Sequence, residues 1–257
     1  DKVGRNYSEV WVVSTSGGDA RQFTSKPVNA SSVAWLPDGN SISFLSRRSA
    51  QDENTQVYQM RIDGGEARKV TAHKTGVSSY QWSPDGSKIA FSSTDPESEE
   101  REKAKKEGRD ENVYDENFRQ VRLWVVDANG GDAKAVYDGE MSTWAYTWAP
   151  DNMTLAIQAT STPLVDASMM YKRIYRVSLG GGPPELITQT EGKLGNMAYS
   201  PDGSQLAFAS AIDLSDPIAQ SVFVVPASGG TARNLTPDYE GSVNSISWEN
   251  DNSIFMN

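Results

Sequence analysis

The amino-acid sequence predicts an all-β chain of repeated four-stranded antiparallel units, with one short charged helical insert. Three observations predict it. A Gly-Gly turn and an aromatic-x-Pro-Asp-Gly turn recur at constant steps through the 257 residues. Apolar residues between these turns alternate with small or polar ones, which is the periodicity of strands. The repeat is as long as one four-stranded blade of a β-propeller, so this is the fold expected over residues 1–257.

The first half of the repeat is a Gly-Gly pair followed, seven residues after its first glycine, by Thr or Tyr. The copies of this position are Thr24, Thr71, Tyr137, Thr188 and Thr236. They are separated by 47, 66, 51 and 48 residues. Such a period is typical of a propeller blade or a kelch-like unit and not of a helical-hairpin repeat.

The second half is an aromatic residue that leads into a Pro-Asp-Gly turn. Its copies begin at Trp35, Trp82, Trp148, Tyr199 and Trp248. Pro presets φ for the turn, and Gly takes the left-handed position that closes it. Asn152 and Asn252 replace this Gly in two copies, and Asn is the next residue to tolerate that conformation. We expect the repeated aromatic residues to form the core between neighbouring blades.

The phase of the repeat at the two ends predicts four whole blades and two complementary halves. The chain opens with a Val10–Val13 strand and closes after an Ile254–Phe255 strand. Either the halves complete one composite blade in a five-bladed ring, or the chain is a segment of a larger ring. We favour the segment, because the first residues carry no start signal and the last turn lies close to the end.

One stretch, residues 95–116, interrupts the repeat and makes the second interval the longest. It holds ten acidic and five basic residues. We predict a solvated helix from about Pro96 to Glu107, capped by Thr94 or Asp95 and ended by Gly108. Three acid-to-base pairs at the favourable i,i+4 spacing support the helix: Glu97–Arg101, Glu99–Lys103 and Glu102–Lys106. Charge runs are usually solvated segments without a function of their own, and this is the simplest interpretation of the arm. The functional alternative is that the arm reaches a neighbouring domain or lines the entrance to an active site.

Several classes of site and partner are disfavoured by composition. Without cysteine there is no disulfide, Cys-ligated zinc or cysteine nucleophile. The single histidine, His73, is expected on the surface of a loop between blades, and no Gly-x-Ser-x-Gly elbow occurs. We therefore assign this chain no catalytic residue, metal or cofactor. A net charge of −10 argues against nucleic acid, and the apolar runs are too short for a membrane.

The repeat resembles that of the TolB-type propellers, which also builds the N-terminal propeller of prolyl oligopeptidase family serine peptidases. The segments that carry this likeness are Trp82–Phe91, Phe44–Arg48, Gln56–Tyr58 and Gly64–Thr71. The insert is similar to that of the acylaminoacyl-peptidase and dipeptidyl-peptidase-like branch of the family. The segments concerned are Glu99–Glu107, Val113–Glu116 and Arg122–Asp127.

The resemblance implies a propeller that restricts access to a serine exopeptidase, a hydrolase active in proteolysis. In the family an α/β-hydrolase domain follows the propeller and holds the catalytic Ser, Asp and His. None of that domain lies in this chain, so the expected partners are a downstream hydrolase domain and short peptides. A homo-oligomer stays open, and the cytoplasm and the periplasm are both compatible with the family.

In such a peptidase, acidic residues of the insert would bind the free α-amino group of a peptide. The residues expected to do so are Glu99, Glu100, Asp110 and Glu111. This chain has Arg109-Asp110-Glu111-Asn112 where the family tends toward an Asp-Asp pair, so no single carboxylate is singled out. The alternative is a stand-alone TolB-like propeller that binds a protein partner. A carbohydrate-active propeller is disfavoured, because no clustered carboxylate pair is apparent in the sequence.

Overall fold

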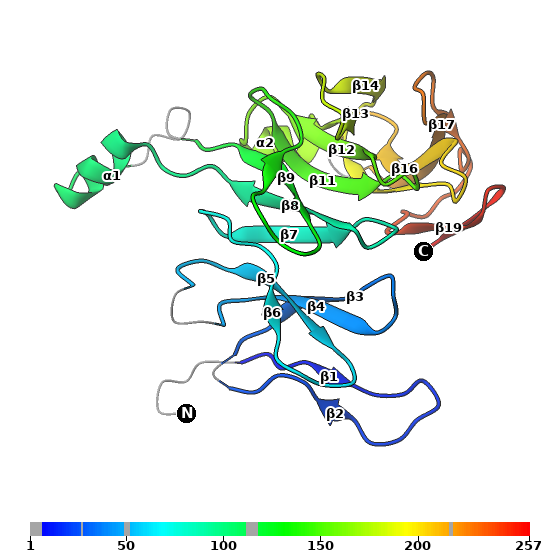
Figure 1. The fold of residues 1–257 in the computed structure, drawn as a ribbon. Helices are drawn as coiled ribbons and strands as arrows, with labels where there is room; N and C mark the ends of the chain where they lie inside the picture. The colour runs from blue at the N-terminus through cyan, green and yellow to red at the C-terminus, as the bar shows by residue number, and fades with distance from the viewer. Residues whose placement is uncertain (1–6, 27, 49–51, 112–117, 216–217) are drawn as a thin grey trace. The chain divides into compact units, whose positions relative to one another are not determined.

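The computed structural model describes residues 7–26, 28–48, 52–111, 118–215 and 218–257. These residues form twenty strands and two short helices (Figure 1). They divide into two compact units. Unit 1 comprises Asp1–Thr94 and Trp124–Lys134, and unit 2 comprises Asp95–Leu123 and Ala135–Asn257.

Unit 1 begins with a two-stranded sheet and continues with a four-stranded antiparallel one. The first consists of β1 (Trp11–Val12) and β2 (Arg21–Gln22). The second has the order β3 (Ser31–Trp35), β4 (Ser41–Ser46), β5 (Gln56–Arg61), β6 (Arg68–Lys69). Every residue of β4 is buried, and Phe44 packs with Val10, Ile42 and Tyr58. Burial on both faces explains why β4 reads as a nearly continuous apolar and small-residue run.

The next sheet is also antiparallel and has four strands. Its strands are β7 (Val77–Trp82), β8 (Lys88–Thr94), β9 (Val121–Asp127) and β10 (Lys134–Ala135). The β8–β9 connection carries the helix α1 (Glu99–Lys106). In unit 1, Ile89 and Phe91 of this sheet pack against Val57 and Val70 of the sheet before it.

Unit 2 holds two further four-stranded antiparallel sheets and a final two-stranded one. The first sheet has the order β11 (Ser142–Trp148), β12 (Thr154–Thr160), β13 (Arg173–Ser178), β14 (Glu185–Thr188). The second has the order β15 (Leu194–Tyr199), β16 (Gln205–Ala211), β17 (Gln220–Pro226), β18 (Arg233–Asn234). β19 (Ile246–Asn250) pairs with β20 (Ser253–Met256), and a helix α2 (Val165–Met170), which we did not predict, joins β12 to β13.

These sheets confirm the predicted fold class. Four sheets have four antiparallel strands in chain order, as blades of a propeller do, and each end of the chain supplies a two-stranded sheet. Strand β4 and its counterparts β8, β12 and β16 are the second strands that the alternating apolar pattern indicated. Their centres are buried, so each sheet has its core on its second strand.

The turns after the aromatic strands agree with the prediction in four of five copies. Gly39, Gly86 and Gly203 have φ of 65°, 70° and 74°, and Asn152 replaces Gly at 59°. For Asn252 the prediction was wrong, because its φ is not positive. There the side-chain oxygen of Asn250 accepts a hydrogen bond from Asn252 N at 2.9 Å, one residue earlier than the Asp of the other copies does. In this last copy the step from the repeat Thr236 to the aromatic Trp248 is 12 residues, against 11 in the other four copies.

The predicted inter-blade role of the repeated aromatic residues holds for some copies and fails for one. Within unit 1, Trp82 Nε1 donates to Ser43 Oγ of the preceding sheet at 2.8 Å. Within unit 2, Trp248 Nε1 donates to Ala198 O at 2.9 Å, and Trp148 is 7% exposed. Trp35 is 54% exposed, so its prediction as core was wrong. The sheet that precedes it in the chain has only two strands.

His73 lies in the β6–β7 loop as expected, but it is not a surface residue. Its half-buried ring packs 4.5 Å from the ring centre of Trp124 and 5.4 Å from that of Phe91. Its Nδ1 lies 3.2 Å from Thr75 O. These contacts give His73 a structural role in unit 1.

Candidate functional site

The four carboxylates predicted to bind a peptide amino group all lie on the charged arm. Glu99 and Glu100 occupy the first turn of α1, and Asp110 and Glu111 follow the helix. All four residues are exposed. No hydrogen bond or ion pair joins these four carboxylates to any other residue among those the structure describes. Residues 112–116 of the predicted insert lie outside the described residues.

The helix α1 is shorter than predicted and is capped by a different residue. It begins at Glu99, and Ser98, neither Thr94 nor Asp95, is its N-cap. Ser98 Oγ accepts from Arg101 N at 3.2 Å, as an N-cap oxygen does. Gly108 ends the helix as predicted, with φ of 79°.

The arm is held by a different set of charges from the three predicted i,i+4 pairs. None of these pairs occurs among the ion pairs of the described residues. Instead Lys105 Nζ pairs with Glu97, which precedes the helix. No residue of α1 is buried, and in Figure 1 the helix lies apart from the strands of its own unit. Charge and capping therefore hold α1, with no contribution from a hydrophobic core.

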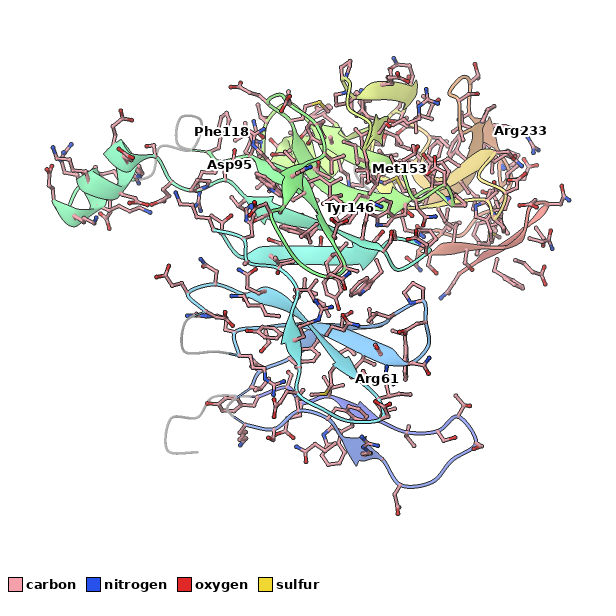
Figure 2. All side chains as sticks on the ribbon, viewed as in Figure 1. Arg61, Asp95, Phe118, Tyr146, Met153 and Arg233 are labelled. Carbon is pink, nitrogen blue, oxygen red and sulfur yellow. The ribbon has the colours of Figure 1, made fainter. Side chains whose placement is uncertain are left out.

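A cleft of about 380 Å³ lies at the base of the arm, where the chain leaves β8 and returns to β9. Its lining residues all belong to unit 2. They are Asp95, Pro96, Glu97, Ser98, Arg101, Phe118, Arg119, Gln120, Arg122 and Glu140. Asp95 and Phe118 mark this place in Figure 2. The volume is within the usual range for sites that bind small molecules.

An ion pair fixes the floor of the cleft. Arg122 Nε lies 2.8 Å from Asp95 Oδ1 and 2.9 Å from Oδ2. The two side chains are 25% and 26% exposed, so solvent screens this pair only in part. Backbone bonds hold the same corner, because Asp95 N donates to Gln120 O at 2.8 Å. The two ends of the arm are thereby joined.

The other ionisable groups of the cleft surround Glu97. The pKa of its carboxyl is lowered, first by the hydrogen bond from Lys105 and also by the positive charges of Lys105, Arg119 and Arg101. Glu97 is therefore ionised at neutral pH. The carboxylate of Glu140 makes no contact with another described side chain within hydrogen-bond distance. The lining thus offers both cations and anions to a ligand.

The lining of the cleft combines charged and apolar groups. The cleft is lined by charged side chains, an aromatic ring and a proline, with no histidine among them. No three His, Cys, Asp or Glu side chains come together as metal ligands in the described parts of the chain. Nor is any described helix long and apolar enough to cross a membrane.

Five of the lining residues lie outside the predicted insert and were missed, and three of these five are charged. Arg119 and Arg122 stand on the returning chain, and Glu140 follows β10. The first two could have been suspected, since they come directly after the charged stretch in the sequence. Glu140 could not be assigned to the cleft from the sequence, because the β10–β11 connection comes close to the base of the arm only in the folded chain.

Comparison with known proteins supports the fold. Residues 3–120 match the family model of the TolB beta propeller domain. No curated protein sequence matches the chain. Among solved structures, the chain is similar to TolB from Acinetobacter baumannii (TM-score 0.55, 18% identity). The match covers 91% of this chain and 50% of that one.

Peptidase propellers are similar as well. The acylaminoacyl peptidase of Pyrococcus horikoshii matches with a TM-score of 0.67 and 14% identity over 96% of this chain and 38% of that one. The β-propeller domain of the Trilobed protease from Pyrococcus furiosus matches at 0.63 and 13%, over 96% and 69%. The chain therefore has the fold of a TolB-like β-propeller and spans well under half the length of the acylaminoacyl peptidase.

Proposed function

We propose that this chain is the non-catalytic, substrate-gating propeller of a serine exopeptidase that releases acyl-amino acids or dipeptides from peptide N-termini. The observation that carries the proposal is the charged arm with a peptide-sized cleft at its base, on a propeller like that of an acylaminoacyl peptidase. The catalytic residues would belong to a hydrolase domain of the same protein, which would be the chief partner of the propeller.

In this function the propeller contributes exclusion and attraction. The blades exclude folded proteins from the serine by their size. The exposed carboxylates of Glu99, Glu100, Asp110 and Glu111 attract the ammonium group of a short peptide. Each exposed ion pair is worth little alone, so the four act together as a local negative field.

A peptide-binding measurement tests the attraction. A short peptide with a free N-terminus and its N-acetylated form are titrated into the chain by calorimetry. We expect the free peptide to bind more tightly, and the variant E99Q/E100Q/D110N/E111Q to abolish the difference. D238N/E240Q, at exposed positions of unit 2 away from the arm, is the control for lost charge. Equal binding of both peptides by the unaltered chain would overturn the ammonium role.

The reading frame around this chain tests the parent activity. A Gly-x-Ser-x-Gly elbow followed by Asp and His within about 300 residues downstream supports the peptidase. A stop codon close after Asn257 contradicts it.

The second candidate is a stand-alone TolB-like propeller that binds a protein partner. The match of residues 3–120 to the TolB beta propeller domain favours it. In that case the arm would be a docking element for the partner. Short peptides would then bind equally to the unaltered chain and to its arm variants.

A further inference from the structure

The charges of the cleft do not all neutralise one another. Of its three arginines, Arg122 is taken up by the floor pair with Asp95. Of its three acids, Glu97 is taken up by Lys105, which stands outside the lining. The groups left without an ion-pair partner among the described residues are therefore Arg101, Arg119 and Glu140.

Among the described residues, the two remaining arginines form hydrogen bonds with backbone oxygens only. Arg101 Nη2 donates to Asp110 O at 3.0 Å, and Arg119 Nη1 donates to Asp95 O at 3.3 Å. A guanidinium has five N–H donors in a fixed fork, so most donors of both groups remain available. Both arginines line the same cleft, and their positive charges contribute to lowering the pKa of the Glu97 carboxyl.

From this geometry we infer that the cleft binds the carboxylate of a short peptide between the guanidinium groups of Arg101 and Arg119. Two guanidinium forks match the planar, four-lone-pair geometry of one carboxylate. Phe118 and Pro96 provide an apolar wall for a neighbouring side chain of the peptide. The site selects a negative group although it lies at the base of an arm that is acidic overall.

The two carboxylates Glu97 and Glu140 of the cleft affect this binding in different ways. Glu97 lines the same cleft and competes with a ligand for the positive charge of both guanidinium groups. Glu140, whose carboxylate has no hydrogen bond or ion pair with another described side chain, can receive a positive group of the same ligand. A short peptide carries both charges, which is why we choose it as the ligand class.

The inference rests on the proposed function only in taking a peptide as the ligand. The proposed function requires a free ammonium group, whereas this site requires a carboxylate. Acetylating the N-terminus tests the first, and amidating the C-terminus tests the second, so one can fail without the other.

Calorimetric titration of the chain at low salt tests the site with three probes: Ala-Ala-Phe, Ala-Ala-Phe-amide and N-acetyl-Ala-Glu-Ala-amide. We expect a carboxylate to improve binding by about fivefold over the amide, a modest factor because water screens the cleft. Tighter binding of Ala-Ala-Phe alone identifies the peptide C-terminus as the source. Tighter binding of the glutamate probe alone identifies an acidic side chain, and tighter binding of both leaves the site general for carboxylates.

The variant R101Q/R119Q should remove this gain. Its matched control is K103Q/K106Q, which also deletes two positive charges but at exposed positions of α1 outside the lining. Arg122 is left unaltered because it joins the two ends of the arm. Both double variants should fold like the parent, since α1 has no buried residue and Arg119 is exposed.

Three results would overturn the inference. The first is equal binding of Ala-Ala-Phe, its amide and the glutamate probe. The second is a loss in K103Q/K106Q as large as that in R101Q/R119Q, which would show a diffuse field instead of a site. The third is no measurable binding of any of the three probes at millimolar concentration.

Discussion

At the scale of single residues, the repeated Thr is the position whose meaning the sequence left open. In three of its four copies the hydroxyl accepts the backbone N–H at the start of the third strand, fourteen residues before it, whereas Thr188 Oγ1 donates to Gln189 O at 3.4 Å. Thr24, Thr71 and Thr236 accept from Val10, Val57 and Val222 at 2.8–2.9 Å. Each hydroxyl thereby supplies an acceptor to an N–H that would otherwise be buried without a partner.

Tyr137 replaces the repeat Thr in one copy and makes a different bond. Its hydroxyl lies 2.7 Å from Thr143 Oγ1. The backbone pairing of the third strand is kept there, because Val136 N donates to Leu123 O as Val70 N does to Val57 O. In that sheet Ser142 Oγ accepts from Val121 N at 3.0 Å, two residues before the position that the repeat Thr serves elsewhere.

Replacing Thr71 by Val should destabilise the chain by about 1–3 kcal/mol. The substitution keeps the shape but leaves Val57 N–H and Gln56 without their hydroxyl partner in a buried place. Chemical denaturation measures the change. Thr231→Val is the control, because Thr231 is exposed and makes no hydrogen bond to another described residue. An unchanged midpoint for T71V would show that this bond contributes nothing to stability.

At the scale of elements, the Pro-Asp-Gly turns depend on their aspartates. Asp85 shows why: its carboxylate accepts from Ser83 Oγ at 2.7 Å and from Ser87 N at 2.9 Å. These bonds, the Ser83 hydroxyl first, lower the pKa of Asp85 from 3.8 to about 2. The aspartates predicted to have a turn role and no catalytic one therefore act as acceptors within the turn.

The stabilising effect of Asp85 should disappear in acid. Because its folded pKa is below the unfolded one, its contribution is complete above about pH 4 and is lost as pH falls through about 2. Thermal melts of the chain and of D85N should therefore differ at pH 6 and converge near pH 2. Asp132→Asn, an exposed residue without turn bonds, controls for the lost charge. A difference that persists at pH 2 would contradict this assignment.

The helix α1 should respond to its C-terminal glycine without affecting the rest of the molecule. Gly108 has φ of 79°, and Arg109 N donates to Ala104 O at 2.9 Å across it. Gly108→Ala should cost the helix about 1 kcal/mol, because alanine is strained at that φ.

Hydrogen exchange of the α1 amides should accelerate in G108A while the global unfolding midpoint stays constant, since α1 buries no residue. Gly108→Asn should restore most of the protection, because Asn tolerates the left-handed region. A lowered global midpoint for G108A would show that α1 stabilises the sheets.

At the scale of the whole molecule, the two-stranded sheets differ from the others because their strands have fewer pairing partners. In its sheet β20 pairs only with β19, and β20 carries Phe255 at 59% exposure. An unpaired strand edge with an exposed apolar side chain is a template for association with another chain.

We therefore expect the isolated chain to self-associate, and the substitution of Phe255 by Lys to reduce this association, because a charge on an edge strand disfavours pairing. Sedimentation velocity over a range of concentrations measures it. A chain that stays monomeric and melts cooperatively would instead favour the five-bladed ring, in which the terminal halves complete one blade.

The number of sheets and their strand order follow from the repeat in the sequence. Most turns do so as well, since Gly86 and Asn152 occupy positions that require a positive φ. These features depend on residues close together in the chain, so each copy of the repeat forms the same strands and turns. The sequence also located the charged arm but misplaced its cap, because Thr94, Asp95 and Ser98 are all good N-caps and only the folded chain selects Ser98. Only the tertiary structure decided which charges share the cleft. Arg101, Arg119 and Glu140 meet there through the β8–β9 and β10–β11 connections, and no spacing in the sequence records a contact between loops.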